Sequence, residues 1–418
     1  MCGVGIYKKG ATMDILQAKQ LVIDAGKQLV ACGLIARTWG NVSCRIDNES
    51  FVITPSGKAY DSLTPDDIVV VKLSDLSYEG DVKPSSEKGL HAQCYLLRSD
   101  CNFVIHTHQM NASVVSAIGN DINKLSDESR AIIGNNIPMG GYGLPGTKTL
   151  MKGVVSALKR SDSKAVIMRH HGAICLGADS EDAFRIANEV EVACASYIYR
   201  RYKTLTNKTA ESLSELNDYA VELIRRSKAS ATAPAINCYD SERVGDSLVV
   251  LDKDGNEKAE IALDDGKLLS GDKYPYEADI HRAVYNRRAD VNSIIHSNQT
   301  EIVAVSKLGR TIRPLLDDFA QIAGTTVKCG VFSILETEKS AQKIAKKLSG
   351  GRNAVMVKDN GAICCGKDKD DAQATEMVVE KNCKATLYAN LFDKPKPINA
   401  LESKLMNLVY RMKYSKQK

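Results

Sequence analysis

Long hydrophobic runs are missing from this sequence, and so is an export signal. No stretch approaches the ~18 consecutive apolar residues that a membrane-spanning helix needs; the run from Ile68 to Val71 ends at Lys72. The segment from Met1 to Lys9 holds too few apolar side chains for the core of a signal peptide. These absences exclude a membrane protein and lead us to expect a cytoplasmic one.

A disulfide framework and a cysteine-based metal site are absent too. The twelve cysteines include no Cys-x-x-Cys pair, and the adjacent Cys364 and Cys365 lack the spacing of a metal site. Disulfide scaffolds are short secreted chains, whereas this chain has 418 residues. We therefore expect reduced thiols that are buried in the core.

The chain also lacks a large excess of positive or negative charge. The 56 basic residues stand against 51 acidic ones, which gives a net charge of +5, and the basic residues form no block. Chains that bind nucleic acid concentrate Lys and Arg on one face, so we expect no nucleic-acid partner. No Gly-x-Gly-x-x-Gly follows a predicted strand, which argues against a doubly wound nucleotide-binding domain.

What the chain does contain is an internal repeat. The segment from His91 to His106 recurs from His281 to His296, and Gly172-Ala-Ile-Cys175 returns as Gly361-Ala-Ile-Cys364. The residues that recur in register within the first segment are His91, Tyr95, Arg98, Asp100, Asn102, Ile105 and His106. Since a domain typically has ~100–200 residues, the repeat predicts two copies of one domain, residues 1–208 and 209–418.

Each copy is predicted to be mixed α/β. Helical spacing of apolar residues begins near Met13 and stops at Gly33, and Ser86 has the character of a helix N-cap. In the first copy we expect helices over residues 13–32, 86–98 and 179–200, and a further helix that follows the strand ending at Thr107 and runs to Ile118. We expect short strands over residues 42–46, 50–54, 102–107 and 165–168.

Three histidines of the first copy have the pattern of a metal site. His106 and His108 end a predicted strand, where residues two apart share a face. His171 follows the strand 165–168, so three imidazoles meet if the two strands are neighbours. Three imidazoles and an open position are typical of catalytic zinc and also suit other divalent ions. His170 is expected to point away from this set.

The second copy has lost this pattern. It carries Asn298 and Asn360 where the first copy has His108 and His171, although the surrounding framework persists. Residues that serve packing alone have no reason to change as a group. The comparison therefore predicts a site in the first copy that is dismantled in the second.

Glu87 and His91 recur in both copies, as Glu277 and His281. They lie four residues apart, on one face of the predicted helix. Because His91 is retained in the copy without the histidine set, we favour a role in packing or in support of the site over one as a ligand.

Three turns of the first copy suit a phosphate group. They offer small hydroxyl or amide side chains beside glycine or a helix N-terminus, where backbone N–H groups hold anions. The turns are Thr38 to Ser43, Thr54 to Gly57 and Pro84 to Glu87. The second copy lacks them together with the histidines, which predicts a phosphorylated small-molecule substrate.

Taken in order, these motifs resemble the class II aldolase/adducin family. They are Gly40-Asn41-Val-Ser43, Thr54-Pro-Ser-Gly57, Ser85-Ser-Glu87, His106-x-His108 and His171-Gly172. The resemblance implies an α/β/α sandwich around a mainly antiparallel sheet, here duplicated in tandem with a degenerate second copy. It also implies a four-fold ring, which two of these chains would close as a homodimer.

The resemblance implies a role for each matching residue. His106, His108 and His171 match the zinc ligands, and Glu87 matches the carboxylate that acts as acid and base beside the metal. Tyr142 is similar to a tyrosine that reaches into a neighbouring subunit's site. The positions that match phosphate binders are Thr38, Asn41, Ser56, Gly57, Ser85 and Ser86.

The implied reaction cleaves a deoxy-ketose 1-phosphate into dihydroxyacetone phosphate and an aldehyde, through a metal-stabilised enediolate. Pentulose-phosphate 4-epimerases of the family carry a His-Ala-Asp-Tyr-type segment, and residues 121–136 contain none. Epimerase, dehydratase and decarboxylase chemistry stay open, as does a non-catalytic adducin-like scaffold. If the two copies alternate in the ring, Phe332 would stand where Tyr142 is expected, and it has no proton to give.

Overall fold

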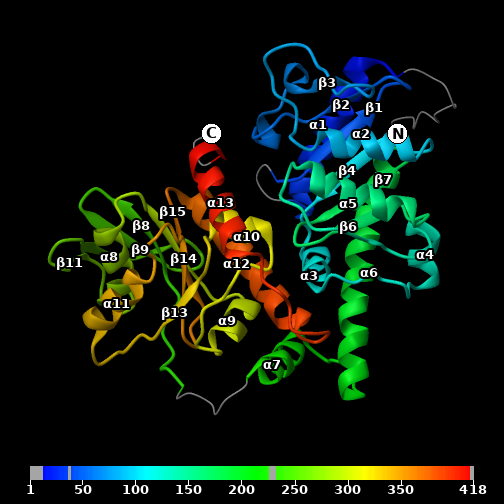
Figure 1. Ribbon diagram of the computed structural model, residues 1–418. Helices are drawn as coiled ribbons and strands as arrows, with labels where there is room; N and C mark the ends of the chain where they lie inside the picture. The colour runs from blue at the N-terminus through cyan, green and yellow to red at the C-terminus, as the bar shows by residue number, and fades with distance from the viewer. Residues whose placement is uncertain (1–12, 36–38, 226–231, 415–418) are drawn as a thin grey trace. The chain divides into compact units, whose positions relative to one another are not determined.

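The computed structural model describes residues 13–35, 39–225 and 232–414 (Figure 1). The chain divides into two compact units, with unit 1 extending to Tyr197 and unit 2 beginning at Ile198. This boundary falls within the long helix α6 (Ser180–Thr206). The domain limits expected from the repeat, 1–208 and 209–418, stay a prediction.

Unit 1 is built on a seven-stranded sheet with the strand order β3-β2-β1-β4-β7-β6-β5. Neighbouring strands are antiparallel except β5 and β6, which are parallel. The strands are β1 (Asn41–Arg45), β2 (Ser50–Ile53), β3 (Val69–Lys72), β4 (Phe103–Thr107), β5 (Met139–Gly140), β6 (Ala165–Met168) and β7 (Ala173–Gly177). The helices besides α6 are α1 (Ile15–Ala31), η1 (Tyr60–Ser62), η2 (Pro65–Asp67), α2 (Lys88–Leu97), α3 (Met110–Ile118), α4 (Asp127–Ile133) and α5 (Lys148–Lys159).

Unit 2 contains an eight-stranded sheet with the order β11-β10-β9-β8-β12-β15-β14-β13. Its strands are β8 (Asp240–Val244), β9 (Ser247–Leu251), β10 (Glu257–Ala262), β11 (Leu268–Ser270), β12 (Ser293–Ser297), β13 (Lys328–Gly330), β14 (Ala354–Val357) and β15 (Ala362–Gly366). Its helices are α7 (Leu213–Ile224), α8 (Ala278–Arg287), α9 (Thr300–Ser306), α10 (Asp317–Ile322), α11 (Thr337–Lys346), α12 (Lys369–Ala389), α13 (Ala400–Val409) and η3 (Tyr410–Tyr414).

The two sheets share one topology. Apart from the additional edge strand β11, every strand of unit 1 has a counterpart at the same place in unit 2. The parallel pair of β5 and β6 corresponds to the parallel pair of β13 and β14. A shared strand order with the same crossovers confirms the tandem duplication that the sequence repeat predicts.

Helices cover both faces of the unit 1 sheet. Successive strand residues point to opposite faces, so the side chains of Ser43 and Cys44 lie on opposite faces of the sheet. Ser43 contacts α2 through His91, whereas Cys44 contacts Met13, which lies just before α1. The apolar core on the α2 side also includes α5. The predicted α/β/α sandwich with a mainly antiparallel sheet is therefore confirmed.

The predicted helix over 13–32 is α1. Asp14 caps it by accepting a hydrogen bond from the N–H of Gln17 at 2.9 Å, and the chain turns away at Gly33, where φ is +69°. Ile15 and Leu16, which belong to the apolar spacing that predicts this helix, are nevertheless 45% and 66% exposed. The buried stripe of the helix therefore begins a turn later, at Ala18.

The helix expected over 86–98 begins later than predicted. It is α2, with Glu87 as the residue before its first turn, so the prediction of Ser86 as N-cap is wrong. The hydroxyl of Ser85 instead accepts the N–H of Glu87 at 3.2 Å. This bond holds Glu87 at the very start of the helix. The helix expected over 179–200 is α6, which continues to Thr206.

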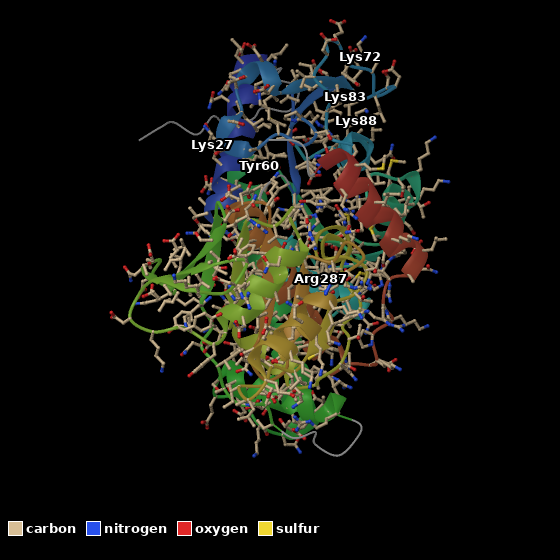
Figure 2. All side chains as sticks on the ribbon, turned by 90° about the vertical axis from the view of Figure 1, so that its left-hand side faces the viewer. Lys27, Tyr60, Lys72, Lys83, Lys88 and Arg287 are labelled. Atoms are coloured by element: carbon tan, nitrogen blue, oxygen red, sulfur yellow. The ribbon has the colours of Figure 1, made fainter. Side chains whose placement is uncertain are left out.

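Tyr60 ties α1 to the beginning of β1. Its ring lies against Gly26 of α1, where a Cβ atom would come within 2.2 Å of the ring, and Figure 2 labels it next to Lys27. Its hydroxyl donates a hydrogen bond to the carbonyl oxygen of Gly40 at 3.0 Å. Because Gly40 precedes Asn41, this contact fixes the end of β1 at which the candidate site residues begin.

Most of the cysteines are buried, as the sequence predicts, but Cys32 is exposed and Cys238 and Cys329 are only partly buried. Among the residues that the structure describes, eleven cysteines are free, and eight of these are buried. In the same part of the chain, the structure contains no helix long and apolar enough to cross a membrane.

A glycine closes the hairpin between β14 and β15, as its counterpart does between β6 and β7. A Cβ atom on Gly361 would lie 2.0 Å from the carbonyl oxygen of Ser297, and one on Gly172 would lie 2.0 Å from that of Thr107. Only glycine therefore allows the hairpin to pass so close to the neighbouring strand.

We predict that Gly361→Ala destabilises unit 2 more than Gly245→Ala does. Both glycines have positive φ, +82° and +57°, but a Cβ on Gly245 meets nothing within 4 Å. The clash at Gly361 should therefore add about 1–3 kcal/mol to the cost that both variants share. Urea unfolding followed by circular dichroism measures the difference. Equal losses for the two variants would contradict the close approach.

Candidate metal centre

Three histidines converge where β4 ends beside β7. His106 is the fourth residue of β4, and His108 follows it on the same face. His171 precedes β7, and Thr107 is paired with Ala173 across these two strands. The ligand nitrogens of the three buried rings lie within 4.8 Å of one another. The structure thus brings the three predicted ligands together, although β4 adjoins the strand after His171 and not the strand before it.

The imidazole rings are oriented by the strands that carry them. The Nε2 atoms of His106 and His108 are 3.0 Å apart, and the ring of His106 is stacked on that of His171 with centroids 4.8 Å apart. Nδ1 of His106 bonds the carbonyl oxygen of Ala173 at 2.9 Å. A carbonyl oxygen only accepts, so Nδ1 carries the proton and Nε2 presents a lone pair to the centre.

Glu87 completes the cluster from the start of α2. Its Oε2 atom lies 3.5 Å from Nε2 of His106, and its Oε1 atom lies 3.4 Å from Nε2 of His171. Asn41, the first residue of β1, donates its Nδ2–H to Oε2 at 2.9 Å. Burial opposes ionisation of this carboxyl, but His106, His171 and Asn41 outweigh it and hold the pKa well below its usual value.

This group of donors fits a divalent cation. Burial lowers the pKa of His106 well below its usual value, so the ring is neutral and its lone pair is available. Oε1 of Glu87 is buried and takes no hydrogen bond from any described residue. Neutral imidazoles that converge beside an ionised carboxylate are the donor set that zinc prefers. Within the described ranges, no other group of three His, Cys, Asp or Glu side chains lies so close together.

His170 and Tyr142 lie beside the centre without joining its ligands. His170 was expected to point away because strand residues alternate, but it lies in a turn with φ of +59°. Its ring meets that of Tyr142 edge to face, with centroids 5.4 Å apart. Tyr142 belongs to the segment between β5 and α5 and is half-buried. Its reach into a neighbouring subunit's site stays a prediction.

Two of the predicted phosphate turns lie side by side. The N–H of Ser56 donates to the carbonyl oxygen of Lys83 at 2.9 Å, and the N–H of Ser85 donates to that of Thr54 at 3.0 Å. Gly57 has φ of +76°, and Ser86 is exposed at the start of α2. These residues therefore surround the helix end that carries Glu87. Thr38 lies outside the described residues.

The side chain of Asn41 makes contacts that its sequence motif did not indicate. Its side chain is held between Glu87 and His91, since its Oδ1 atom accepts a hydrogen bond from Nε2 of His91. The signal that could have revealed this contact is a pair of periodicities, residues 41, 43 and 45 on a strand and residues 87, 91 and 95 on a helix. Whether Asn41 also contacts phosphate stays a prediction.

Comparison with known proteins agrees with this site. A family model described as Class II Aldolase and Adducin N-terminal domain matches residues 20–198 and 233–387, one segment in each unit. The chain belongs to this family. The resemblance that the motifs indicated is thereby confirmed, and the two matched segments agree with the duplication seen in the sheets.

Relatives within the class II aldolase family match one unit's length of this chain. L-fuculose phosphate aldolase of Escherichia coli K12 is 36% identical over 177 residues, which cover 42% of this chain and 80% of that protein. A 5-deoxy-D-ribulose 1-phosphate aldolase of Bacillus thuringiensis is 31% identical over 189 residues, or 45% of this chain and 87% of that protein. A solved structure of an L-fuculose 1-phosphate aldolase is 29% identical and covers 49% of this chain and 92% of its own, with a TM-score of 0.42.

Unit 2 fills the corresponding place with its own main chain. Asn360, the counterpart of His171, accepts the N–H of Ile236 at 3.0 Å and donates to the carbonyl oxygen of Pro234 at 2.9 Å. Glu277, the counterpart of Glu87, accepts the N–H of Asn237 at 2.6 Å. The polar groups at this place in the second class II aldolase copy are therefore satisfied by the segment 234–237.

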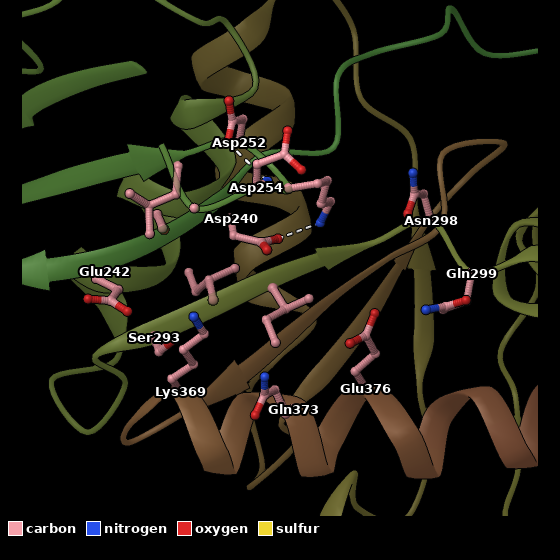
Figure 3. A pocket seen from close by; sticks show the side chains of 16 residues that line it. Asp240, Glu242, Asp252, Asp254, Ser293, Asn298, Gln299, Lys369, Gln373 and Glu376 are labelled. Atoms are coloured by element: carbon pink, nitrogen blue, oxygen red, sulfur yellow. Dashed lines mark hydrogen bonds and ion pairs between the residues drawn. The ribbon is translucent and has the colours of Figure 1, made fainter. Parts of the chain in front are cut away.

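A polar pocket of about 330 Å³ lies elsewhere in unit 2, between β8, β12 and the start of α12 (Figure 3). Asp240 lines it and pairs with Lys253 at 2.5 Å. Asn298, the counterpart of His108, is exposed and lines this pocket. Asn298 thus faces this pocket, whereas Asn360 and Glu277 contact neighbouring residues of the segment 234–237.

We predict that His171→Asn removes the bound metal ion from the protein, whereas His170→Asn does not. The two histidines are adjacent, but only His171 lies in the cluster, and asparagine readily adopts the left-handed backbone of residue 170. The measurement is zinc per chain by elemental analysis after loading and removal of excess ion. An ion retained in His171→Asn would rule this histidine out as a ligand.

We also predict that Asn298→His combined with Asn360→His does not create a second metal site. The segment 234–237 bonds Glu277 and Asn360 in unit 2, and residue 298 faces another pocket. Zinc content should therefore stay at the wild-type value. A gain of one ion per chain would contradict this prediction and would show that the segment 234–237 moves aside easily.

Proposed function

We propose that unit 1 is a metal-dependent aldolase that cleaves a deoxy-ketose 1-phosphate into dihydroxyacetone phosphate and an aldehyde. The observation that carries this proposal is the convergence of His106, His108 and His171 on the buried carboxylate of Glu87. The relatives named as fuculose-phosphate and deoxyribulose-phosphate aldolases support the choice of substrate class.

His106, His108 and His171 would hold the metal ion in this proposal. Zinc is the proposed ion because three imidazoles with an open position are typical of catalytic zinc, and another divalent metal also suits imidazole. A bound divalent cation supplies Lewis acidity for the ketone oxygen and stabilises the negative charge that develops there.

Glu87 and Tyr142 are the proposed proton carriers. In the direction of synthesis, Glu87 takes a proton from the hydroxymethyl carbon next to the ketone of dihydroxyacetone phosphate. That carbon then bonds to the aldehyde carbon, and the phenol of Tyr142 gives a proton to the oxygen that becomes a hydroxyl. Cleavage reverses these steps, so that Tyr142 recovers its proton from the hydroxyl and Glu87 returns its own to carbon.

The phosphate group of the substrate would lie at the start of α2. Ser56 and Gly57 come from one turn and Ser85 and Ser86 from the other, and main-chain hydrogen bonds hold the two turns together. The N-terminus of α2 adds a favourable helix dipole. A phosphate held there positions a reacting bond several atoms away, beside Glu87.

We also propose the assembly and the location that the sequence implied. Two chains would close a ring of four units with two working sites. A reducing compartment such as the cytoplasm suits the free, buried thiols of the described residues.

We predict that zinc-loaded protein releases dihydroxyacetone phosphate from a deoxy-ketose 1-phosphate and that Glu87→Gln lowers kcat about 10²–10⁴-fold. Glutamine keeps the size and the contact with Asn41 but cannot take a proton. The assay uses a panel of deoxy-ketose 1-phosphates and pentulose 5-phosphates. It follows dihydroxyacetone phosphate through its reduction by a coupled dehydrogenase.

The matched control is Glu277→Gln, which changes the same residue in unit 2 and should leave kcat unchanged. Isomerised pentulose 5-phosphate without release of dihydroxyacetone phosphate would replace the aldolase with an epimerase. Loss of water or of carbon dioxide from a member of the panel would indicate a dehydratase or a decarboxylase. Protein that binds no metal and turns over no sugar phosphate would support a scaffold.

A further inference from the structure

The helix α2 and the strand β1 mesh at regular intervals behind the candidate metal centre. Asn41, Ser43 and Arg45 point from β1 toward α2, because residues two apart share a face of a strand. Glu87, His91 and Tyr95 point back, because residues four apart share a face of a helix. All of these side chains except that of Arg45, which donates to the main-chain oxygen of Tyr95, form a continuous row of hydrogen bonds.

The row starts in the core and ends at the carboxylate. The hydroxyls of Tyr95 and Ser43 are 2.6 Å apart, and Oγ of Ser43 is 2.6 Å from Nδ1 of His91. Nε2 of His91 contacts Oδ1 of Asn41, whose Nδ2 contacts Oε2 of Glu87 at 2.9 Å. All five residues are almost fully buried, so water does not compete for these contacts.

The direction of every donor in the row follows from the amide of Asn41. Its Nδ2–H donates to Oε2 of Glu87, so its carbonyl oxygen faces Nε2 of His91. Nε2 of His91 must then donate. Burial lowers the pKa of His91 to about 4, so the ring is neutral and holds one proton, and Nδ1 accepts from Ser43. Ser43 in turn accepts from Tyr95.

We propose that His91 is a positioning residue for Glu87. Its Nε2–H holds the Asn41 amide in the one orientation that donates to Oε2, and so directs the carboxylate toward His106 and His171. This inference rests on the proposed function, in which Glu87 moves a proton at carbon. Without the bond from His91, the amide of Asn41 is free to rotate and to turn its oxygen toward the carboxylate, which would repel it.

Comparison with unit 2 distinguishes a positioning role of His91 from a role in packing alone. It keeps the inner part of the row, since Oγ of Ser241 lies 2.7 Å from Nδ1 of His281 and 2.9 Å from the hydroxyl of Tyr285. It has Tyr239 at the position of Asn41, and Nε2 of His281 has no hydrogen-bond partner among the described residues. The bond from histidine to amide therefore exists only in the unit that has the metal centre.

Two substitutions at position 91 distinguish the two hydrogen bonds that the His91 ring makes, one to Asn41 and one to Ser43. Glutamine places its amide nitrogen near the position of Nε2 and keeps a donor for Asn41. Asparagine is shorter, reaches only the position of Nδ1 and keeps a partner for Ser43. If His91 acts through Asn41, His91→Gln should retain function and His91→Asn should lose it.

We expect His91→Asn to lower kcat for cleavage about 10–100-fold, the usual cost of losing a group that orients an active-site residue. KM and bound zinc per chain should stay at wild-type values, and His91→Gln should stay within about threefold of wild type. The matched control is His281→Asn, which should lower the thermal unfolding midpoint as much as His91→Asn does and leave kcat unchanged. Equal losses of kcat in His91→Asn and His91→Gln, or none in either, would overturn the positioning role.

A second measurement tests the row of hydrogen bonds independently of enzyme activity. Histidine labelled with ¹⁵N gives few signals, because the chain has seven histidines. In the metal-free protein, the signal that is lost in His91→Gln should report a neutral ring protonated at Nε2. Protonation at Nδ1 would overturn the inference even if the enzyme is active. If the wild type cleaves no substrate but this tautomer is found, the proposed function fails while the orientation of the row stands.

Discussion

Unit 1 is arranged around the carboxylate of Glu87, which is buried beside three imidazoles. An unpaired buried charge costs several kcal/mol, so Glu87 needs donors and, in the proposed enzyme, a cation. The amide of Asn41 from β1 supplies such a donor. The imidazoles of His106 in β4, of His108 just after it and of His171 in the turn before β7 gather where the cation would bind. Gly172 lets that turn approach β4 closely enough for the rings to meet.

The sheet and α2 supply the precision that such a cluster requires. A strand that repeats every two residues and a helix that repeats about every four meet at matched intervals, and each contact fixes the next. The inner contacts, Ser43 with His91 and Tyr95, recur in unit 2 as Ser241 with His281 and Tyr285. The scaffold therefore persists without the metal centre, which identifies the outer contacts of Asn41 as the part specific to the site.

The sequence predicted what periodicity and repetition determine. The repeat, the α/β elements and the histidine set followed from local spacing and from comparison of the two copies. It did not predict that Ser85, and not Ser86, bonds the start of α2, because the two serines are equivalent until the helix start is known. The contact of Asn41 with Glu87 joins residues 46 positions apart, so it depends on how β1 and α2 are placed in three dimensions.

The second unit shows how a buried site is lost without loss of the fold. Glu277 keeps its carboxylate but takes an N–H of the segment 234–237, and Asn360 both donates to and accepts from the same segment. A main-chain donor satisfies a buried carboxylate much as Asn41 and a cation would. Because this segment bonds both Glu277 and Asn360, their buried polar groups stay paired without a metal ion. His281 is an exception, since its Nε2 atom keeps the position from which His91 contacts Asn41 and finds no partner there. The row of hydrogen bonds in unit 2 therefore ends at His281, without counterparts of the bonds that Asn41 makes in unit 1.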